Sequence, residues 1–385
     1  MLRCAIRVTL VVTIAIVGCA RPYRMNGDEL SEATQWPFHR GDRAATGALS
    51  DGSFSGKLDV LWEKRIGDKP AGPLTLNNDR LIFPGTKRKI KFFDASNGRQ
   101  LGKWKVKADC QTGVAISDSL AVYSTSPPRN RLRCQNLLSG KTIWSALLKD
   151  AASGSILLTD RLIIGSADGE LLAFGLSSGE TLWKHDADAH LVAPVSYADG
   201  VIYQPADNGA VIAVSADSGQ ELFVARAMAP LVSAAAVSSG RIYCVDVKGM
   251  VYSFSSLDGQ ELWRKQLSGP GWAAPAVSNG RLFVVHRGGE LLALDTATGS
   301  VLWRFATVEV VRAAATVAGR FVLVATMGGK VFSLDAATGT LIERRQLQGG
   351  IARSPVTDGN RVYVATDGGM IVCYGEHDEN YSQAD

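Results

Sequence analysis

Short apolar runs separated by polar turns are the dominant pattern of this chain, and residues 271–303 contain one complete cycle of it. The runs are WAAPAVS at 272–278, RLFVVH at 281–286, ELLALD at 290–295 and VLWRF at 301–305. They are rich in β-branched and aromatic residues, they lack helical spacing, and turns that contain glycine separate them. The cycle therefore predicts four short strands, which we call A, B, C and D in chain order.

The cycle recurs with a period near 40 residues along most of the chain. The glycine that precedes strand D returns at intervals of 42, 39, 40, 40, 40 and 40 residues. These repeat glycines are Gly98, Gly140, Gly179, Gly219, Gly259, Gly299 and Gly339. A fixed period of this length indicates repeat units that stack in a row or close into a ring.

The count of strands favours a closed ring. Strand C occurs eight times, but the last A–B–C set, at residues 351–374, has no strand D after it. A D-like strand, VLWEKR, lies at residues 60–65 and has no A–B–C set before it. Pairing of these two segments would complete the last unit. We therefore predict an all-β fold, an eight-bladed β-propeller of four-stranded antiparallel blades whose ring is closed by the N-terminal strand. An open solenoid is the alternative.

An aromatic residue recurs once in almost every D strand. Each such ring buries roughly 150–250 Å² when it is enclosed, which suits packing between blades better than a role in one active site. The predicted blade-docking residues are Trp62, Trp104, Trp144, Trp183, Phe223, Trp263 and Trp303.

The first 18 residues have the features of an export signal. Two arginines precede a ten-residue apolar run that is too short to span a bilayer. The IVGC ending at residues 16–19 resembles the bacterial lipobox, which implies cleavage before Cys19 and lipidation of its thiol. Several acyl chains would give a stable membrane anchor. By resemblance to enteric lipoproteins, in which an Asp at this position retains the protein at the inner membrane, Ala20 implies sorting to the outer membrane. A signal without lipidation is the alternative.

These patterns divide the chain into four predicted segments. They are a lipoprotein signal peptide at 1–18, a lipid-anchored tether and N-terminal segment at 19–55, the propeller at 56–375 and a disordered tail at 376–385.

Composition constrains the function only weakly. The chain has 385 residues, of which 46% are hydrophobic and 20% charged, as expected of a large globular core. A net charge of +4 does not indicate nucleic-acid binding. The sequence has no phosphate-binding loop, no zinc spacing and no nucleophile elbow, so it predicts no catalytic residue, metal or cofactor. It has no Cys-x-x-Cys pair, and we predict no disulfide framework.

Strand order assigns the loops to two faces. The D-to-A connections and the B–C turns share one face, and the A–B turns and repeat glycines share the other. The D-to-A connections vary most in sequence, as a recognition surface does. The residues predicted to form a partner-binding face are His190, Leu191, Met228, Leu231, Pro270 and Trp272. Scattered apolar loop residues without a binding role are the alternative.

Two neighbouring B–C turns are strongly basic. The residues of this basic patch are Lys87, Arg88, Lys89, Arg129, Arg131 and Arg133. The patch is either a solvated rim or a docking site for an acidic partner or anionic lipid head groups.

The motif Asp-x-x-Thr-Gly-x-x-x-Trp, as in Asp295–Trp303, resembles the PQQ-like β-propeller repeat. This resemblance covers about residues 56–375. With eight blades and a lipobox, the chain resembles the BamB family, scaffold lipoproteins of outer-membrane β-barrel assembly. The resemblance implies a non-enzymatic scaffold at the periplasmic face of the outer membrane, a monomeric propeller that contacts a BamA-like assembly subunit. The contact loops of that family carry Leu and Arg or paired carboxylates, whereas this chain has Ala189–Leu191 in one loop, and Pro270 and Trp272 in another.

Two alternatives from other classes stay open. The same repeat builds quinone-dependent dehydrogenases, and Trp272 with Arg312 and Arg353 would be the residues to stack on and clamp a quinone. This chain lacks the adjacent cysteines that are common in those enzymes. A propeller that senses a small ligand is the other alternative.

Overall fold

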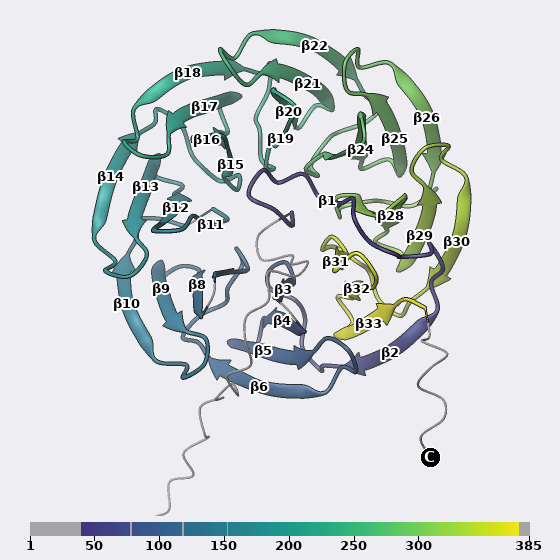
Figure 1. Ribbon diagram of the computed structural model, residues 1–385, viewed down its shortest axis with the longest axis horizontal. Coiled ribbons are helices and arrows are strands. Elements are labelled where there is room, and N and C mark those ends of the chain that lie inside the picture. Colours follow the sequence, from purple (N-terminus) through teal and green to yellow (C-terminus); the bar gives the residue numbers. More distant parts are fainter. Residues whose placement is uncertain (1–39, 78, 118, 152, 377–385) are drawn as a thin grey trace, which may run out of the picture.

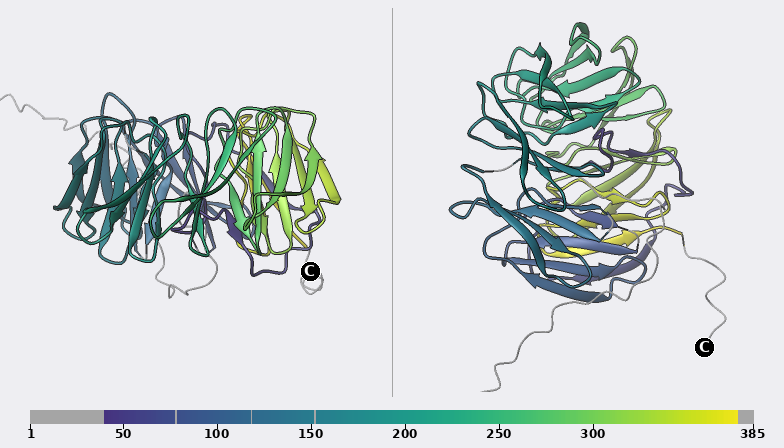
Figure 2. Two further views of the ribbon diagram at one scale, coloured as in Figure 1. Left: turned by 90° about the horizontal axis from the view of Figure 1, so that it is seen from above. Right: turned by 60° about the vertical axis from the view of Figure 1, so that its left-hand side comes forward.

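The fold is a ring of eight sheets around a central channel, seven with four strands and one with a fifth strand added (Figure 1). The computed structural model describes residues 40–376 with the exception of 78, 118 and 152. The predicted signal peptide, Cys19, most of the tether and nearly all of the predicted tail therefore lie outside the described residues. Seen from the edge, the ring is a disc in which the strands run between two faces (Figure 2).

Each blade repeats the order A, B, C, D from the channel outward. The A strands are β3 (Thr75–Asn77), β7 (Val114–Ser117), β11 (Ile156–Leu157), β15 (Ser196–Ala198), β19 (Ala236–Ser238), β23 (Ala276–Ser278), β27 (Thr316–Ala318) and β31 (Val356–Thr357). The B strands are β4 (Arg80–Gly85), β8 (Leu120–Ser124), β12 (Arg161–Gly165), β16 (Val201–Pro205), β20 (Arg241–Val245), β24 (Arg281–His286), β28 (Phe321–Ala325) and β32 (Val362–Ala365).

The C and D strands complete the blades. The C strands are β5 (Lys89–Asp94), β9 (Arg131–Asn136), β13 (Glu170–Gly175), β17 (Ala210–Ser215), β21 (Met250–Ser255), β25 (Glu290–Asp295), β29 (Lys330–Asp335) and β33 (Met370–Tyr374). The D strands are β6 (Gln100–Lys105), β10 (Thr142–Leu147), β14 (Thr181–Asp186), β18 (Glu221–Arg226), β22 (Glu261–Gln266), β26 (Val301–Ala306), β30 (Leu341–Gln346) and β2 (Val60–Arg65).

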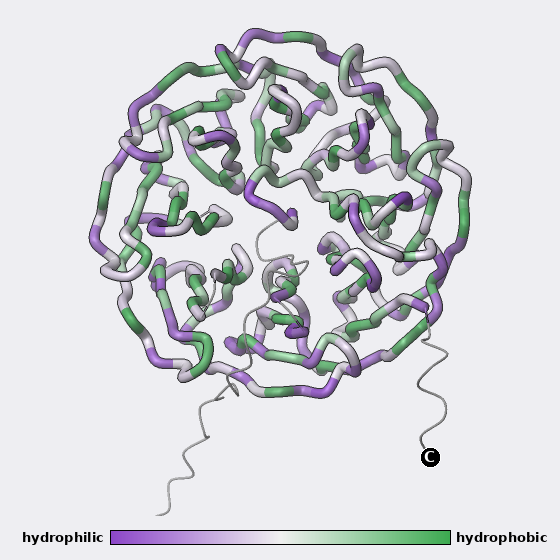
Figure 3. The backbone as a smooth tube through the Cα atoms, viewed as in Figure 1, coloured by the Kyte–Doolittle hydropathy of each residue, from purple (hydrophilic) through white to green (hydrophobic). Residues whose placement is uncertain are grey.

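The apolar runs become the B and C strands because both faces of each blade are covered by neighbours. β13 is buried at every position, whereas the outer strand β14 is mostly exposed. One core cluster joins Ile163 and Leu171 of one blade to Ile202 and Ile212 of the next. Hydrophobic stretches accordingly alternate with hydrophilic turns along the chain (Figure 3). The core is thus a series of layers between blades. Because each blade shares its core layers with both neighbours, we expect the ring to fold as one cooperative unit.

The ring closes as predicted, through the N-terminal strand. β2 pairs antiparallel with β33, with Trp62 opposite Cys373, and completes the sheet that contains β31 and β32. The prediction of an eight-bladed, all-β propeller is therefore confirmed.

Each D-strand aromatic packs on the repeat glycine of the following blade. A Cβ atom added at Gly219 would lie 2.6 Å from Cε3 of Trp183, and φ at Gly219 is +71°. The same relation joins the other six aromatics to the other repeat glycines. The Nε1–H of Trp183 also donates to the carbonyl of Ala216 across the blade boundary, over 3.0 Å. A β-bulge at Leu182 turns the indole toward the neighbouring blade and leaves the leucine outside.

The Asp and Thr of the repeat motif build the turn that presents this glycine. The carboxylate of Asp335 accepts the amides of Ala337 and Thr338, each over 3.0 Å, and the hydroxyl of Thr338. The hydrogen bond from Arg320, together with those from Thr338 and Ala337, holds the pKa of Asp335 below its ordinary value. The motif is therefore a structural turn, and its recurrence alone indicates no chemistry.

The segment before β2 has a role that the sequence did not predict. Residues 43–49 cross the inner strands of four successive blades, and β1 (Ala48–Leu49) adds parallel to β27. The carbonyl groups of Arg43, Ala44, Thr46 and Gly47 accept backbone amides from the four inner strands in order. This part of the predicted tether is therefore built into the channel wall (Figure 1).

None of the described residues forms a helix long and apolar enough to cross a membrane.

Candidate functional site

The D-to-A connections and the B–C turns lie on one face, which we call the connection face. The amide of Ala187 donates to the carbonyl of Gly169, and the amide of Asp207 donates to the carbonyl of His190. The A–B and C–D turns meet on the opposite face, where the amide of Ala216 donates to the carbonyl of Gly200. The loops that vary most in sequence are therefore gathered on a single surface.

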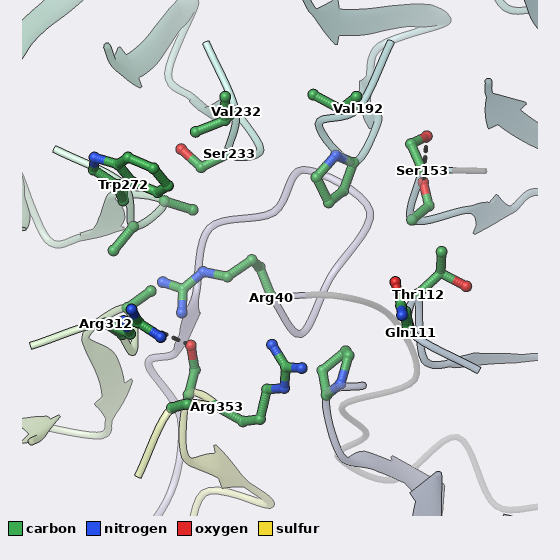
Figure 4. Close-up of a pocket in the computed structure, with 18 of the residues that line it drawn as sticks. Arg40, Gln111, Thr112, Ser153, Val192, Val232, Ser233, Trp272, Arg312 and Arg353 are labelled. Carbon is green, nitrogen blue, oxygen red and sulfur yellow. Dashed lines mark hydrogen bonds between the residues drawn. The ribbon is translucent and has the colours of Figure 1, made fainter. Parts of the chain in front are cut away.

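A pocket opens at the centre of this face, where the channel meets the connections (Figure 4). Its volume is about 380 Å³, and residues from all eight blades line it. Most of them occupy equivalent places in their connections, because each connection turns inward at the same point of the repeat. We call this cavity the central pocket.

Arg40 lies at the pocket and comes from the N-terminal segment. Its side chain is 3% exposed, and its Nη2 donates to the carbonyl of Ala315 over 2.7 Å. Burial lowers the pKa of Arg40 to about 10, against the opposing effect of Asp42, so the guanidinium stays charged at neutral pH. Gly47 makes room for it, since a Cβ there would lie 1.7 Å from Nη2 of Arg40.

Two further arginines reach the same pocket. Arg353 donates from Nη2 to the carbonyl of Ala71 over 2.8 Å, and burial lowers its pKa. Arg312 is exposed at the rim. Trp272 stands beside them with 53% of its surface exposed, and the guanidinium of Arg287 lies 5.6 Å from its ring centre. Three cations and one aromatic ring therefore surround the opening.

A buried histidine supports the loop that carries Trp272. The amide of Gly288 donates to Nδ1 of His286 over 3.0 Å, which places the ring proton on Nε2. That nitrogen faces Ser268 Oγ at 2.9 Å and Glu290 Oε2 at 3.4 Å. Because the serine and the carboxylate share one nitrogen, and that nitrogen carries the proton, the trio cannot activate the serine as a nucleophile. It links the loop to the adjacent turn.

Four of the residues predicted to contact a partner lie exposed on the connection face. His190, Met228, Pro270 and Trp272 are accessible, and Met228 is 69% exposed. The backbone carbonyl of Ala167 contacts the ring of His190 and raises its pKa. Of these four residues, Trp272 also lines the central pocket.

Leu191 and Leu231 require a correction. Both are 0% exposed and belong to core clusters between blades, so their side chains do not reach the surface. They occupy the same place in successive connections, where a large aliphatic side chain packs beneath the loop into the core between two blades. The prediction that they contact a partner is wrong.

The basic patch divides between two blades. Lys87 and Arg88 are exposed at one turn, while Arg129, Arg131 and Arg133 line a groove of about 490 Å³ at the next. The groove also holds Lys107 and Leu147 and has no acidic lining residue. In the part of the chain that the structure describes, none of the six predicted patch residues is in an ion pair. Both interpretations, a solvated rim and a docking site, remain compatible with this arrangement.

The cysteines offer no reactive site among the described residues. Cys110, Cys134, Cys244 and Cys373 are free and buried, and burial raises the pKa of Cys110 to about 12. The described residues also contain no group of three or more His, Cys, Asp or Glu side chains that could hold a metal ion.

Known proteins resemble this chain in sequence and in fold. The family described as outer membrane protein assembly factor BamB matches residues 167–272, 247–341 and 308–378. No curated protein sequence matches the chain. BamB from Moraxella catarrhalis superposes with a TM-score of 0.72 at 17% identity, over 83% of this chain and 100% of that chain.

Other solved structures share the fold equally well. The quinohemoprotein alcohol dehydrogenase from Comamonas testosteroni has a TM-score of 0.74 at 12% identity, over 91% of this chain and 82% of that chain. The computationally designed Ika8 protein has a TM-score of 0.75 at 16% identity, over 83% and 100%. At these identities the superpositions show the fold alone. The three matched sequence segments, in contrast, run without a gap over more than half of the chain, and the chain therefore belongs to the BamB family of PQQ-like repeat β-propellers.

Proposed function

We propose that the chain is a non-enzymatic scaffold that supports assembly of outer-membrane β-barrel proteins. Membership of the BamB family carries this proposal. The chain would be exported, lipidated at Cys19 and held at the periplasmic face of the outer membrane. Its connection face would dock a protein partner, a BamA-like assembly subunit, and the basic patch would add contacts to acidic groups.

The connection face supports this role through its exposed side chains. Trp272 and Met228 are large, apolar and accessible on one face, and aromatic and methionine side chains are enriched in protein interfaces. Trp272 is held in place by Arg287 and by the His286-supported loop, so it would lose little conformational freedom on binding. Such an anchored ring has the properties of a binding hot spot.

We expect the substitution Trp272→Ala to weaken partner binding by about 2 kcal/mol, the range found for aromatic hot spots. Binding would be measured by recovery of the partner with the purified chain from solubilised membranes, followed by titration of the recovered partner. Leu257→Ala is the matched control, because Leu257 is 87% exposed but lies at a C–D turn on the opposite face.

Unchanged binding by a folded Trp272→Ala variant would show that Trp272 does not contribute to the interface. Equal losses in both variants would show that the effect is not specific to the connection face. An absorbance spectrum of a bound quinone in the purified wild-type chain would move the proposal to the dehydrogenase alternative.

A further inference from the structure

We propose that the central pocket binds a small anion with two or more carboxylate or phosphate groups. This inference goes beyond the scaffold function and does not depend on it. Three arginines line the pocket, and its lining contains no aspartate or glutamate among the described residues. Like charges that face one cavity repel one another, and an anion between them would relieve that repulsion.

Arg40 is the strongest reason for a ligand. Its Nε and Nη1 are buried and have no hydrogen-bond partner in the described part of the chain. A buried charged group with unsatisfied donors is costly to keep, and native structures seldom leave one unpaired. The fold nevertheless builds a place for it, through the backbone bonds of residues 43–49 and through Gly47, whose missing Cβ leaves room for the guanidinium.

Arg353 repeats this feature from a different blade. Its Nη2 is fixed by the carbonyl of Ala71, but its Nε is buried and lacks a partner among the described residues. Arg312 adds a third cation at the rim, where no described carboxylate pairs with it. Figure 4 shows that the three arginine side chains extend from separate parts of the chain and lie around one opening. A ligand that meets more than one of them needs anionic oxygens at more than one end.

The size and the remaining lining define the ligand further. A volume of about 380 Å³ falls in the range of small-molecule sites, roughly 300–1,000 Å³. The pocket also offers Gln111, Thr112, Ser153 and Ser233, which can bond to hydroxyl or carbonyl groups of a ligand. Because Arg40 is 3% exposed, a flat protein surface cannot reach it, whereas a small molecule that enters the pocket can. Arginine recognises both carboxylates and phosphates through paired N–H donors.

The test is a calorimetric titration of the mature wild-type chain with citrate and, separately, with inorganic pyrophosphate. Both titrations are made at constant ionic strength with sodium chloride as the reference salt, because unspecific screening must be the same in all samples. We expect saturable binding of at least one of the two anions at a ratio of one per chain. We expect Arg312→Gln to weaken that binding at least tenfold.

Arg344→Gln is the matched control, because Arg344 is also exposed but lies on the outer strand β30, away from the pocket. Arg312 has no partner in the described fold, so its substitution should leave the protein folded, which a circular dichroism spectrum checks. Arg40→Gln is a second variant, for use if it folds. Binding of citrate alone would assign the site to carboxylates, and binding of pyrophosphate alone would assign it to phosphates.

The proposal is overturned if neither anion binds above the salt reference, or if Arg312→Gln binds as tightly as the wild type. A loss of equal size in Arg344→Gln would also overturn it, because the effect would then come from overall charge. Partner recovery is a separate measurement, so a chain that binds the anion but no partner, or the reverse, distinguishes this inference from the scaffold function.

Discussion

Replacing Trp183 by alanine should lower the free energy of unfolding by about 3–5 kcal/mol, as expected when a large buried aromatic side chain is removed. The ring is 8% exposed and lies on the backbone of Gly219 in the following blade. Its Nε1–H bond to Ala216 crosses the same boundary. The substitution would therefore open a cavity between two blades and remove one of the two side-chain hydrogen bonds that the carbonyl of Ala216 accepts, the other coming from Nη1 of Arg161. Urea unfolding followed by circular dichroism would measure the change.

Leu182→Ala is the control for this prediction. Leu182 is the adjacent residue on the same strand, but it is 48% exposed at the bulge, so its loss should cost less than about 1 kcal/mol. If the two variants lost equal stability, the assignment of the D-strand aromatics to packing between blades would be wrong.

Removal of the closing strand should have the second large effect. A chain that begins at residue 67 lacks β2 and exposes the edge of β33, together with the surface that Trp62 covers on Tyr363. Open edges of this kind pair with other chains, and the core layer between the last blade and the first would lose its outer strand. We expect this chain to lose cooperative unfolding and to aggregate, as measured by thermal denaturation and by light scattering.

A second truncated chain, which begins at residue 56, distinguishes the contribution of the closing strand from that of the segment before it. This chain lacks β1 and the residues that cross the inner strands but keeps β2. We expect it to remain a folded monomer with reduced stability. A cooperative, monomeric chain starting at residue 67 would show that closure by β2 is dispensable.

The fold could be predicted from the sequence because each blade has the same structural requirements, and these requirements give the sequence a repeating pattern. Strands B and C need apolar residues on both faces, the turn before strand D needs a glycine at positive φ, and that glycine receives the aromatic ring of the preceding blade. These demands recur every 40 residues or so, and each copy strengthens the prediction. The unpaired strand at residues 60–65 then required a closed ring.

The site could be predicted only in part, because its residues are not periodic. Arg40 comes from a polar segment with no repeat of its own, and nothing in the sequence indicates that residues 43–49 line the channel. The burial of Leu191 and Leu231, in contrast, had a signal that the prediction did not use. Val311 and Ile351 hold the equivalent places in two later blades, with Gly271 as the exception between them, and an aliphatic residue that recurs at the repeat period indicates the core.

The most direct test of the scaffold function is a photo-crosslink from position 272 in living cells. A photoreactive amino acid replaces Trp272, and a second strain carries it at position 257 on the opposite face. Mass spectrometry then identifies the crosslinked proteins. We expect a BamA-like assembly subunit from position 272 and not from position 257. Recovery of no protein from position 272, with a cofactor spectrum in the purified chain, would contradict the scaffold function.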